Sequence, residues 1–437
     1  MADEFWSACE SGNLELVKSL EIPENINFSD LFGFVCMEGK FNVAEWLLTI
    51  HPDIDVSSNN NQAFISSCGH GNMAMAQYIY SINSNIHNIA EAFSFSCGDG
   101  HFEIAKWILS NHVEIDISYN DEYAFRVACE NGHIQIVKWL LTIKPTIDIS
   151  AKNNHAFIKA SGNGHLEIAQ LIISENLTTE IYTSAFIEAC KHGNTDSAKW
   201  LWSIDNSIDI SAQNEIAFID SCGYGHFEQA KWLLSLNPNI NISANSDAAF
   251  IDSCKLGHLD IAKWLLSLKE DIYKTADFDT AFIGTCRNGY LNVAQWLVTI
   301  KKDINISAKK NDAFKWACHN GHLEIAKWIF SINPHMPMSK LMNIILAKWV
   351  IWHHIDVVTW LCSINKYGYI NVKFSDLSTE VKNILIYYNT VDPDTLELAD
   401  LQYYLSRTNN VVPKGFKNKY NLKVSERGTR TKPAPHN

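Results

Sequence analysis

The sequence predicts an all-α fold, a solenoid of about 12 stacked helical hairpins with short extended fingers and a helical C-terminal cap. Three observations predict it. The residues before a recurring glycine have the apolar spacing of a short helix, and the residues after it have that of a second helix. The glycine itself recurs at intervals of 32 residues seven times, 29 twice and 27 once, at Gly12, Gly39, Gly71, Gly100, Gly132, Gly164, Gly193, Gly225, Gly257, Gly289 and Gly321.

One repeat, residues 249–280, shows the local logic. Ala249, Phe250 and Cys254 belong to one apolar stripe, which predicts a short helix over 249–256. Gly257 follows, where a glycine can adopt a positive φ and end that helix. The segment GHLDIAKWLL then predicts a second amphipathic helix over 258–267. We therefore expect a helical hairpin in each repeat.

The segment between hairpins is polar and carries an I-x-I alternation, as in NPNINIS at 237–243. This pattern favours a short extended finger over a helix. Because a shortened helix would uncover core, we expect the 29-residue intervals to shorten the fingers near Asn85 and Asn176 instead.

The strings GHLDIAKWLL, GHLEIAKWIF and GHIQIVKWLL resemble the second helix of ankyrin repeats, over residues 3–365. AFxxAC stands where that family shows TPLHxAA, and Ile-Asp-Ile-Ser replaces its usual finger. The Trp-, Asn- and Ile-rich style resembles the ankyrin repeat proteins of amoeba-infecting giant viruses. The resemblance implies a protein-binding scaffold.

Ten of the eleven cysteines share one position, three residues before the glycine. Stacked helices lie ~8–10 Å apart, too far for a disulfide, and single thiols in a row do not converge on a metal. We therefore expect reduced, buried thiols that act as small apolar side chains at Cys9, Cys36, Cys68, Cys97, Cys129, Cys190, Cys222, Cys254, Cys286 and Cys318.

Two other residue types recur in register. A tryptophan stands seven residues after the glycine in nine repeats and predicts core between repeats, rather than a base-stacking row, at Trp46, Trp107, Trp139, Trp200, Trp232, Trp264, Trp296, Trp328 and Trp360. A histidine directly after the glycine predicts a local hydrogen bond at the helical turn, rather than a metal array, at His101, His133, His165, His226, His258 and His322.

Composition narrows the function classes. No apolar run reaches the ~18 residues of a membrane span, and the N-terminus lacks a signal peptide pattern, so we expect an intracellular, cytoplasmic monomer. The net charge is −13, the last 27 residues carry +6, and the main body is therefore acidic, which disfavours nucleic acid as its partner. Catalytic and nucleotide motifs are absent from the sequence, which predicts no enzyme, cofactor or metal.

The two positions between the cysteine and the glycine change character from repeat to repeat. By the resemblance, the first helix and the fingertips form the recognition surface. The candidate partner-binding residues are Glu130, Asn131, Lys191, His192, Tyr224, Lys255, Arg287 and His319 at the helix ends, and Asn153, Asn214, Glu215, Asp247, Asp279 and Lys310 at the fingertips. Simple tolerance of solvated positions would also explain their variation.

The repeat pattern ends after Trp360. Residues 366–408 predict a helical cap, and 409–437 a basic, disordered tail that is an alternative nuclear signal. LSTEVKNILIYY also resembles the start of an F-box, so residues 374–405 suggest an alternative function as a ubiquitin-ligase substrate adaptor. An enzyme of unrecognised type is the third hypothesis, and a protein-binding scaffold the first.

Overall fold

The computed structural model describes residues 2–23, 26–84, 86–174, 176–338, 340–341, 344–345, 354–364 and 382–385. Over these residues the chain forms helices and turns without any strand, which confirms the all-α fold class. The predicted cap over 366–408 and the adaptor segment over 374–405 lie outside the described residues except for 382–385, and the tail over 409–437 lies outside them entirely.

The chain divides into two compact units, Met1–Ala217 and Phe218–Asn437. The helices of the first unit are α1 (Ala2–Ser11), α2 (Leu14–Ser19), α3 (Phe28–Met37), α4 (Phe41–Ile50), α5 (Ser58–Gly69), α6 (Met73–Ile82), α7 (Ile89–Gly98), α8 (Phe102–Asn111), α9 (Tyr119–Glu130), α10 (Ile134–Ile143), α11 (Ala151–Gly162), α12 (Leu166–Ile172), α13 (Thr179–Lys191) and α14 (Thr195–Ile204). The boundary between the units falls within α15 (Ala212–Gly223).

The second unit continues the same alternation. Its helices are α16 (Phe227–Leu236), α17 (Ala244–Lys255), α18 (Leu259–Leu268), α19 (Ile272–Thr275), α20 (Phe278–Asn288), α21 (Leu291–Ile300), α22 (Ala308–His319), α23 (Leu323–Ile332) and α25 (Ile355–Ile364). In the repeat at 249–280, α17 and α18 end within one residue of the predicted helix ends. The segment after α18 was expected to be extended and instead contains the short helix α19.

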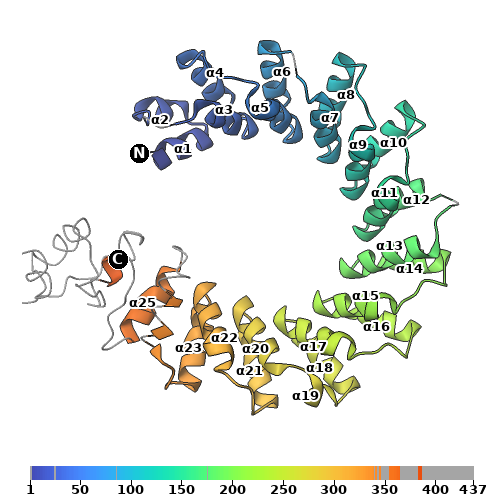
Figure 1. Cartoon of the computed structure of the whole chain (residues 1–437), viewed down its shortest axis with the longest axis vertical. Coiled ribbons are helices and arrows are strands. Elements are labelled where there is room, and N and C mark those ends of the chain that lie inside the picture. Colours follow the sequence, from blue (N-terminus) through green and yellow to red (C-terminus); the bar gives the residue numbers. More distant parts are fainter. Residues whose placement is uncertain are drawn as a thin grey trace, which may run out of the picture. The chain divides into compact units, whose positions relative to one another are not determined.

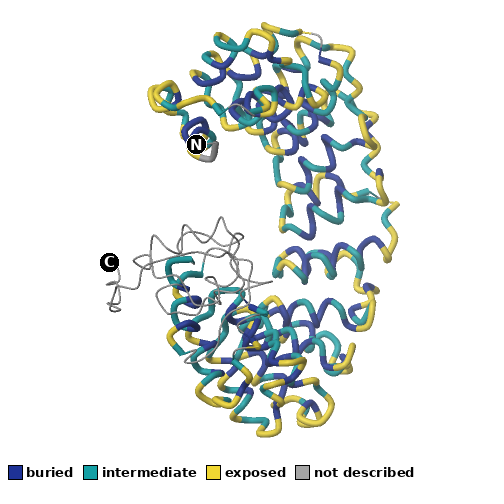
Figure 2. Tube along the Cα trace, turned by 60° about the vertical axis from the view of Figure 1, so that its left-hand side comes forward, coloured by how far each residue is buried: buried dark blue, intermediate teal, exposed yellow. Residues whose placement is uncertain are grey.

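Within each unit the first helices of successive repeats pack on one another, as α3, α5, α7, α9 and α11 do. Within a repeat the second helix packs on the first helix, as α4 does on α3 and α18 does on α17. The first helices and the second helices therefore form two rows, and the second helices make few contacts with each other (Figure 1). The side chains between the two rows are buried (Figure 2). We call the exposed side of the first-helix row the first-helix face.

A phenylalanine from each first helix between α1 and α22 fills the core at 0–1% exposure, at Phe5, Phe32, Phe64, Phe93, Phe125, Phe157, Phe186, Phe218, Phe250, Phe282 and Phe314. The recurring tryptophans are half-buried. Where a recurring tryptophan contacts a core phenylalanine, that phenylalanine belongs to the preceding repeat. Ring centroids lie 6.2 Å apart for Phe218 and Trp264, and 6.1 Å apart for Phe282 and Trp328. The predicted role of tryptophan between repeats is confirmed.

Every aligned glycine has a positive φ, between 68° and 92°. At Gly257, φ is 88°. The left-handed conformation ends the first helix and turns the chain into the second, as predicted.

The fingers differ from the expected extended segments. Six of them form an Asx turn, in which an Asp or Asn side chain accepts the backbone N–H of a serine two residues later, as Asp148 does from Ser150 at 2.9 Å. Three consecutive residues in the left-handed region follow, such as Lys152, Asn153 and Asn154 with φ of 52–59°. Non-glycine residues rarely adopt this conformation, and Asn and Asp, which adopt it more readily than other residues, occur in each of these turns.

The short intervals have two different structural solutions. Between Gly71 and Gly100, α6 keeps its 10 residues and the left-handed turn is missing, as expected. Between Gly164 and Gly193, α12 has only 7 residues, so the expectation that helices keep their length is wrong there. The lost helical turn is compensated by α13, which extends over 13 residues from an N-cap at Thr178.

Candidate functional site

The candidate residues at the helix ends lie on the first-helix face, with unequal exposure. In the first unit, Asn131 and His192 are exposed, whereas Glu130 and Lys191 are half-buried. In the second unit, Tyr224 and Arg287 are exposed, whereas Lys255 and His319 are half-buried. Each unit therefore presents a row of chemically different side chains on one face.

Part of this row holds neighbouring repeats together. The Nδ2 of Asn131 donates to the carbonyl of Gly98 in the preceding repeat at 2.7 Å, and Asn320 donates to Arg287 O at 2.7 Å. These carbonyls lie at the C-terminus of a helix, where intrahelical partners run out. The asparagine before the aligned glycine therefore caps the neighbouring helix, so Asn131 has a structural role that the sequence analysis missed.

The histidine after the glycine also forms a hydrogen bond to the C-terminal end of the first helix in the preceding repeat. The Nε2–H of His322 donates to Arg287 O at 3.0 Å. In another repeat, a Cβ placed on Gly100 would lie 2.6 Å from Cε1 of His133. The hydrogen bond of His322, predicted to be local to its own turn, therefore reaches the preceding repeat instead. Burial lowers the pKa of His133, His258 and His322.

The position directly after the cysteine packs against the following first helix. The Lys255 side chain occupies the space above Gly284, and its Nζ also lies 3.0 Å from Asp252 Oδ1. The Arg287 guanidinium stacks over the ring of Trp316 at 4.0 Å. Because these contacts already restrict the two side chains, binding of a partner would cost less side-chain conformational entropy.

The fingertip candidates separate into exposed and buried residues. Asn153, Asn214 and Lys310 are exposed, and Asp279 is half-buried. Glu215 and Asp247 are 7% and 1% exposed, so their expected place on the fingertip surface is wrong. Both are the third residue of a left-handed turn, a position that directs the side chain inward in these two fingers.

A row of buried hydroxyls also links the first helices, and the sequence analysis did not identify it. Ser253 Oγ lies 3.1 Å from the carbonyl oxygen of Cys222 in the preceding repeat, and Thr285 Oγ1 lies 3.0 Å from that of Cys254. A Ser or Thr directly before the aligned cysteine is the sequence pattern that could have predicted this row. The aligned cysteines themselves are buried at 0–3% exposure, as predicted. Desolvation raises the pKa of the thiols of Cys9, Cys36, Cys68, Cys97, Cys129, Cys222, Cys254, Cys286 and Cys318.

Within the part of the chain that the structure describes, no three His, Cys, Asp or Glu side chains are placed to hold a metal ion. None of the described helices has the length and apolar character to cross a bilayer. A pocket does occur on the first-helix face, between α3 and α5. The first-helix face is therefore the candidate site, as a surface for binding.

Comparison with known proteins agrees with this geometry. The family described as ankyrin repeats (3 copies) matches residues 93–185, 157–245, 186–276 and 250–337, which together span more than half of the chain. No curated protein matches the sequence significantly. Ankyrin repeats are generally protein-binding modules and typically non-catalytic. The helical hairpins, the left-handed glycines and this match together show that the chain belongs to the ankyrin repeat family.

Proposed function

We propose that this chain is a protein-interaction scaffold that binds its partner on the first-helix face. The observation that carries the proposal is the contrast between the constant core and the varied face. Phenylalanine recurs at one core position of each first helix from α1 to α22. The residue after the cysteine varies, from glycine in three of these helices to Glu130, Lys191, Lys255, Arg287 and His319 in others. Tyr and Arg on such a face are favoured hot-spot residues of protein interfaces.

The size of a protein interface sets the expected footprint. A standard interface uses ~20–30 residues a side, so several consecutive repeats must contribute. The scaffold is proposed to act in the cytoplasm as a monomer. The Trp-, Asn- and Ile-rich repeat style supports an origin in an amoeba-infecting giant virus, and the partner would then be a host protein.

The test is a comparison of variants with the same fold. Tyr224, Lys255 and Arg287 are changed together to alanine, and proteins captured from cell lysate are compared with those captured by the natural chain. The matched control changes Lys231, Lys263 and Gln295, exposed residues of second helices, to alanine. We expect the first variant to lose a captured protein that the control retains. Equal capture by both variants would contradict a binding site at these three residues.

A further inference from the structure

The pocket between α3 and α5 lies where α3 lacks a side chain that the other first helices from α1 to α22 have. At the position three residues before the aligned cysteine, or before Ser161 in α11, four first helices carry Trp6, Ser94, Arg126 or Lys315. Six carry isoleucine, at Ile65, Ile158, Ile187, Ile219, Ile251 and Ile283. In α3 this position is Gly33. No atom lies within 4 Å of the place where a Cβ on Gly33 would stand, so the missing side chain leaves open space.

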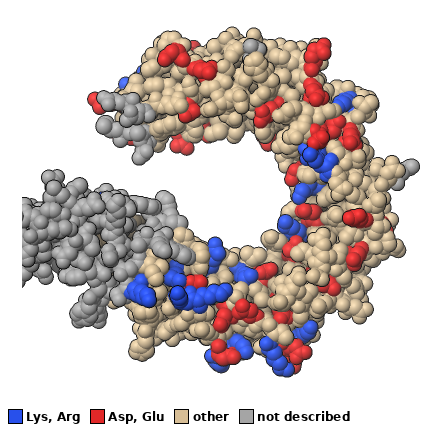
Figure 3. Space-filling view, in the orientation of Figure 1, with Lys and Arg blue, Asp and Glu red and all other residues tan. Residues whose placement is uncertain are grey.

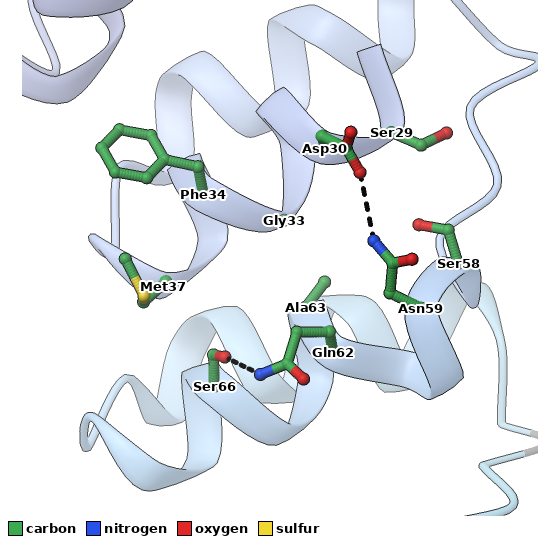
Figure 4. Close-up of a pocket in the computed structure, with 10 residues that line it drawn as sticks. All are labelled: Ser29, Asp30, Gly33, Phe34, Met37, Ser58, Asn59, Gln62, Ala63 and Ser66. Atoms are coloured by element: carbon green, nitrogen blue, oxygen red, sulfur yellow. Dashed lines mark hydrogen bonds between the residues drawn. The ribbon is translucent and has the colours of Figure 1, made fainter. Parts of the chain in front are cut away.

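The pocket is lined by both apolar and polar residues, and the exposed Asp30 and Asn59 form part of its rim (Figure 4). The apolar lining residues are Gly33, Phe34, Met37 and Ala63, and the other polar ones are Ser29, Ser58, Gln62 and Ser66. Its volume is about 230 Å³. Small-molecule sites usually measure ~300–1,000 Å³, so this pocket suits one long side chain better than a whole small ligand.

The Asp30 carboxylate is held in position at this rim. Its Oδ2 accepts Asn27 Nδ2 at 2.7 Å, and its Oδ1 accepts Asn59 Nδ2 at 3.1 Å. Both partners are neutral amides, and among the described residues no lysine or arginine forms an ion pair with Asp30. The carboxylate is therefore exposed at the rim of the pocket without a basic partner among these residues.

The surroundings have the same sign of charge. Residues 1–100 contain 13 Asp and Glu against two Lys and no Arg. Acidic side chains are accordingly more frequent than basic ones on the visible face of these repeats (Figure 3). A surface of one sign attracts partners of the opposite sign and raises their association rate.

We infer that this pocket is a subsite for an arginine side chain carried on a basic segment of a partner protein. The inference rests on the proposed protein-binding function. The aliphatic stem packs on Phe34 and Met37, because long cationic side chains bury their methylenes while the charged head stays at the rim. The head then pairs with Asp30, and a guanidinium matches a carboxylate with two parallel hydrogen bonds.

The test uses the full chain with ¹³C-methyl-labelled methionine, since the Met37 methyl group lines the pocket. The probe is the peptide Gly-Ser-Lys-Gly-Arg-Gly-Lys-Ser-Gly, compared with a version that has neutral citrulline in place of the arginine. The Met37 signal is assigned with Met37→Leu. We expect the arginine peptide to shift this signal and the citrulline peptide to bind at least about tenfold more weakly, a factor that corresponds to ~1.4 kcal/mol.

Two variants and a control complete the design. In Asp30→Asn both peptides should bind equally and weakly, and in Gly33→Ile the Met37 shift should vanish although the helix is preserved. Glu38→Gln removes the same charge from an exposed residue outside the pocket and should change affinity less than twofold. The inference is overturned if citrulline binds as well as arginine, if Asp30→Asn still distinguishes the peptides, or if Met37 does not respond. This readout is independent of capture at Tyr224, Lys255 and Arg287, so either proposal can fail alone.

Discussion

Removal of one tryptophan should loosen a single junction between repeats. Trp264 on α18 contacts two aromatic rings of the preceding repeat, with centroid distances of 6.2 Å to Phe218 and 5.2 Å to Phe227. Truncation of a buried Trp or Phe to alanine costs ~3–5 kcal/mol. Because Trp264 is half-buried, we expect Trp264→Ala to cost about 3 kcal/mol, including the loss of both aromatic pairs.

The location of this loss is as informative as its size. Repeats in a solenoid support only their neighbours, so the damage should stay near α15 to α18. Urea unfolding followed by circular dichroism should show an added early step, and hydrogen exchange should accelerate in these helices. Tyr224→Ala is the control, because this side chain is 49% exposed and its loss should change stability by less than ~0.5 kcal/mol.

A single unfolding transition with less than ~1 kcal/mol lost would refute the reasoning. Faster hydrogen exchange spread evenly over the second unit would also refute it. Either result would mean that the Trp–Phe contacts do not determine the stability of one junction.

Three further changes test other features of the repeat. Gly100→Ala should destabilise by about 1–2 kcal/mol or more, because φ is +85° and the new Cβ meets His133. Gly33→Ala should stabilise by up to ~1 kcal/mol, because this glycine has open space and an ordinary helical backbone. Equal urea midpoints for the two variants would contradict both expectations. The aligned cysteines should react with a thiol reagent only in denaturant, since all ten are buried and burial also raises the pKa of Cys9 to about 11. Fast labelling of the native protein would contradict this. Burial lowers the pKa of His133, His258 and His322 below the ordinary 6.5, so the unfolded chain binds more protons and stability falls as pH drops below 6.5. The urea midpoint should be lower at pH 5.0 than at pH 7.5. Changing the three histidines to asparagine, which follows the aligned glycine at Asn194, should reduce this difference. A midpoint that does not fall at pH 5.0 would contradict the assignment to these histidines.

The helical register could be predicted because periodicity and one glycine determine it independently. The apolar spacing around Phe250 and Cys254 placed the first helix, and the left-handed Gly257 placed its end. The contact of Trp264 with the preceding repeat followed from its position on the apolar stripe. Each of these features depends on local sequence chemistry, which repeats from hairpin to hairpin.

The fingers could not be predicted in the same way. Lys152 and Glu215 adopt a left-handed backbone that their own propensities disfavour, so tertiary packing must select it. The D-x-S or N-x-S sequence before each of these turns was the available signal, since it forms the Asx turn in all six fingers. Without that signal, Glu215 and Asp247 were placed on the surface although they are buried.

Variation along the first-helix face has two physical sources, and only one of them concerns a partner. Where Lys255 extends over the next helix, that helix has Gly284, and where Gly162 leaves space, the Cβ of Glu188 approaches it. Such pairs vary together because they must fit each other. Gly33 is different, because no neighbouring side chain fills the space that it leaves. A helix interior with glycine loses ~1 kcal/mol relative to alanine, so an unfilled vacancy at this position lowers stability without a compensating contact inside the repeat stack. A contact from outside the stack would provide that compensation, which is why the pocket at Gly33 is stronger evidence for a ligand than the variable residues themselves.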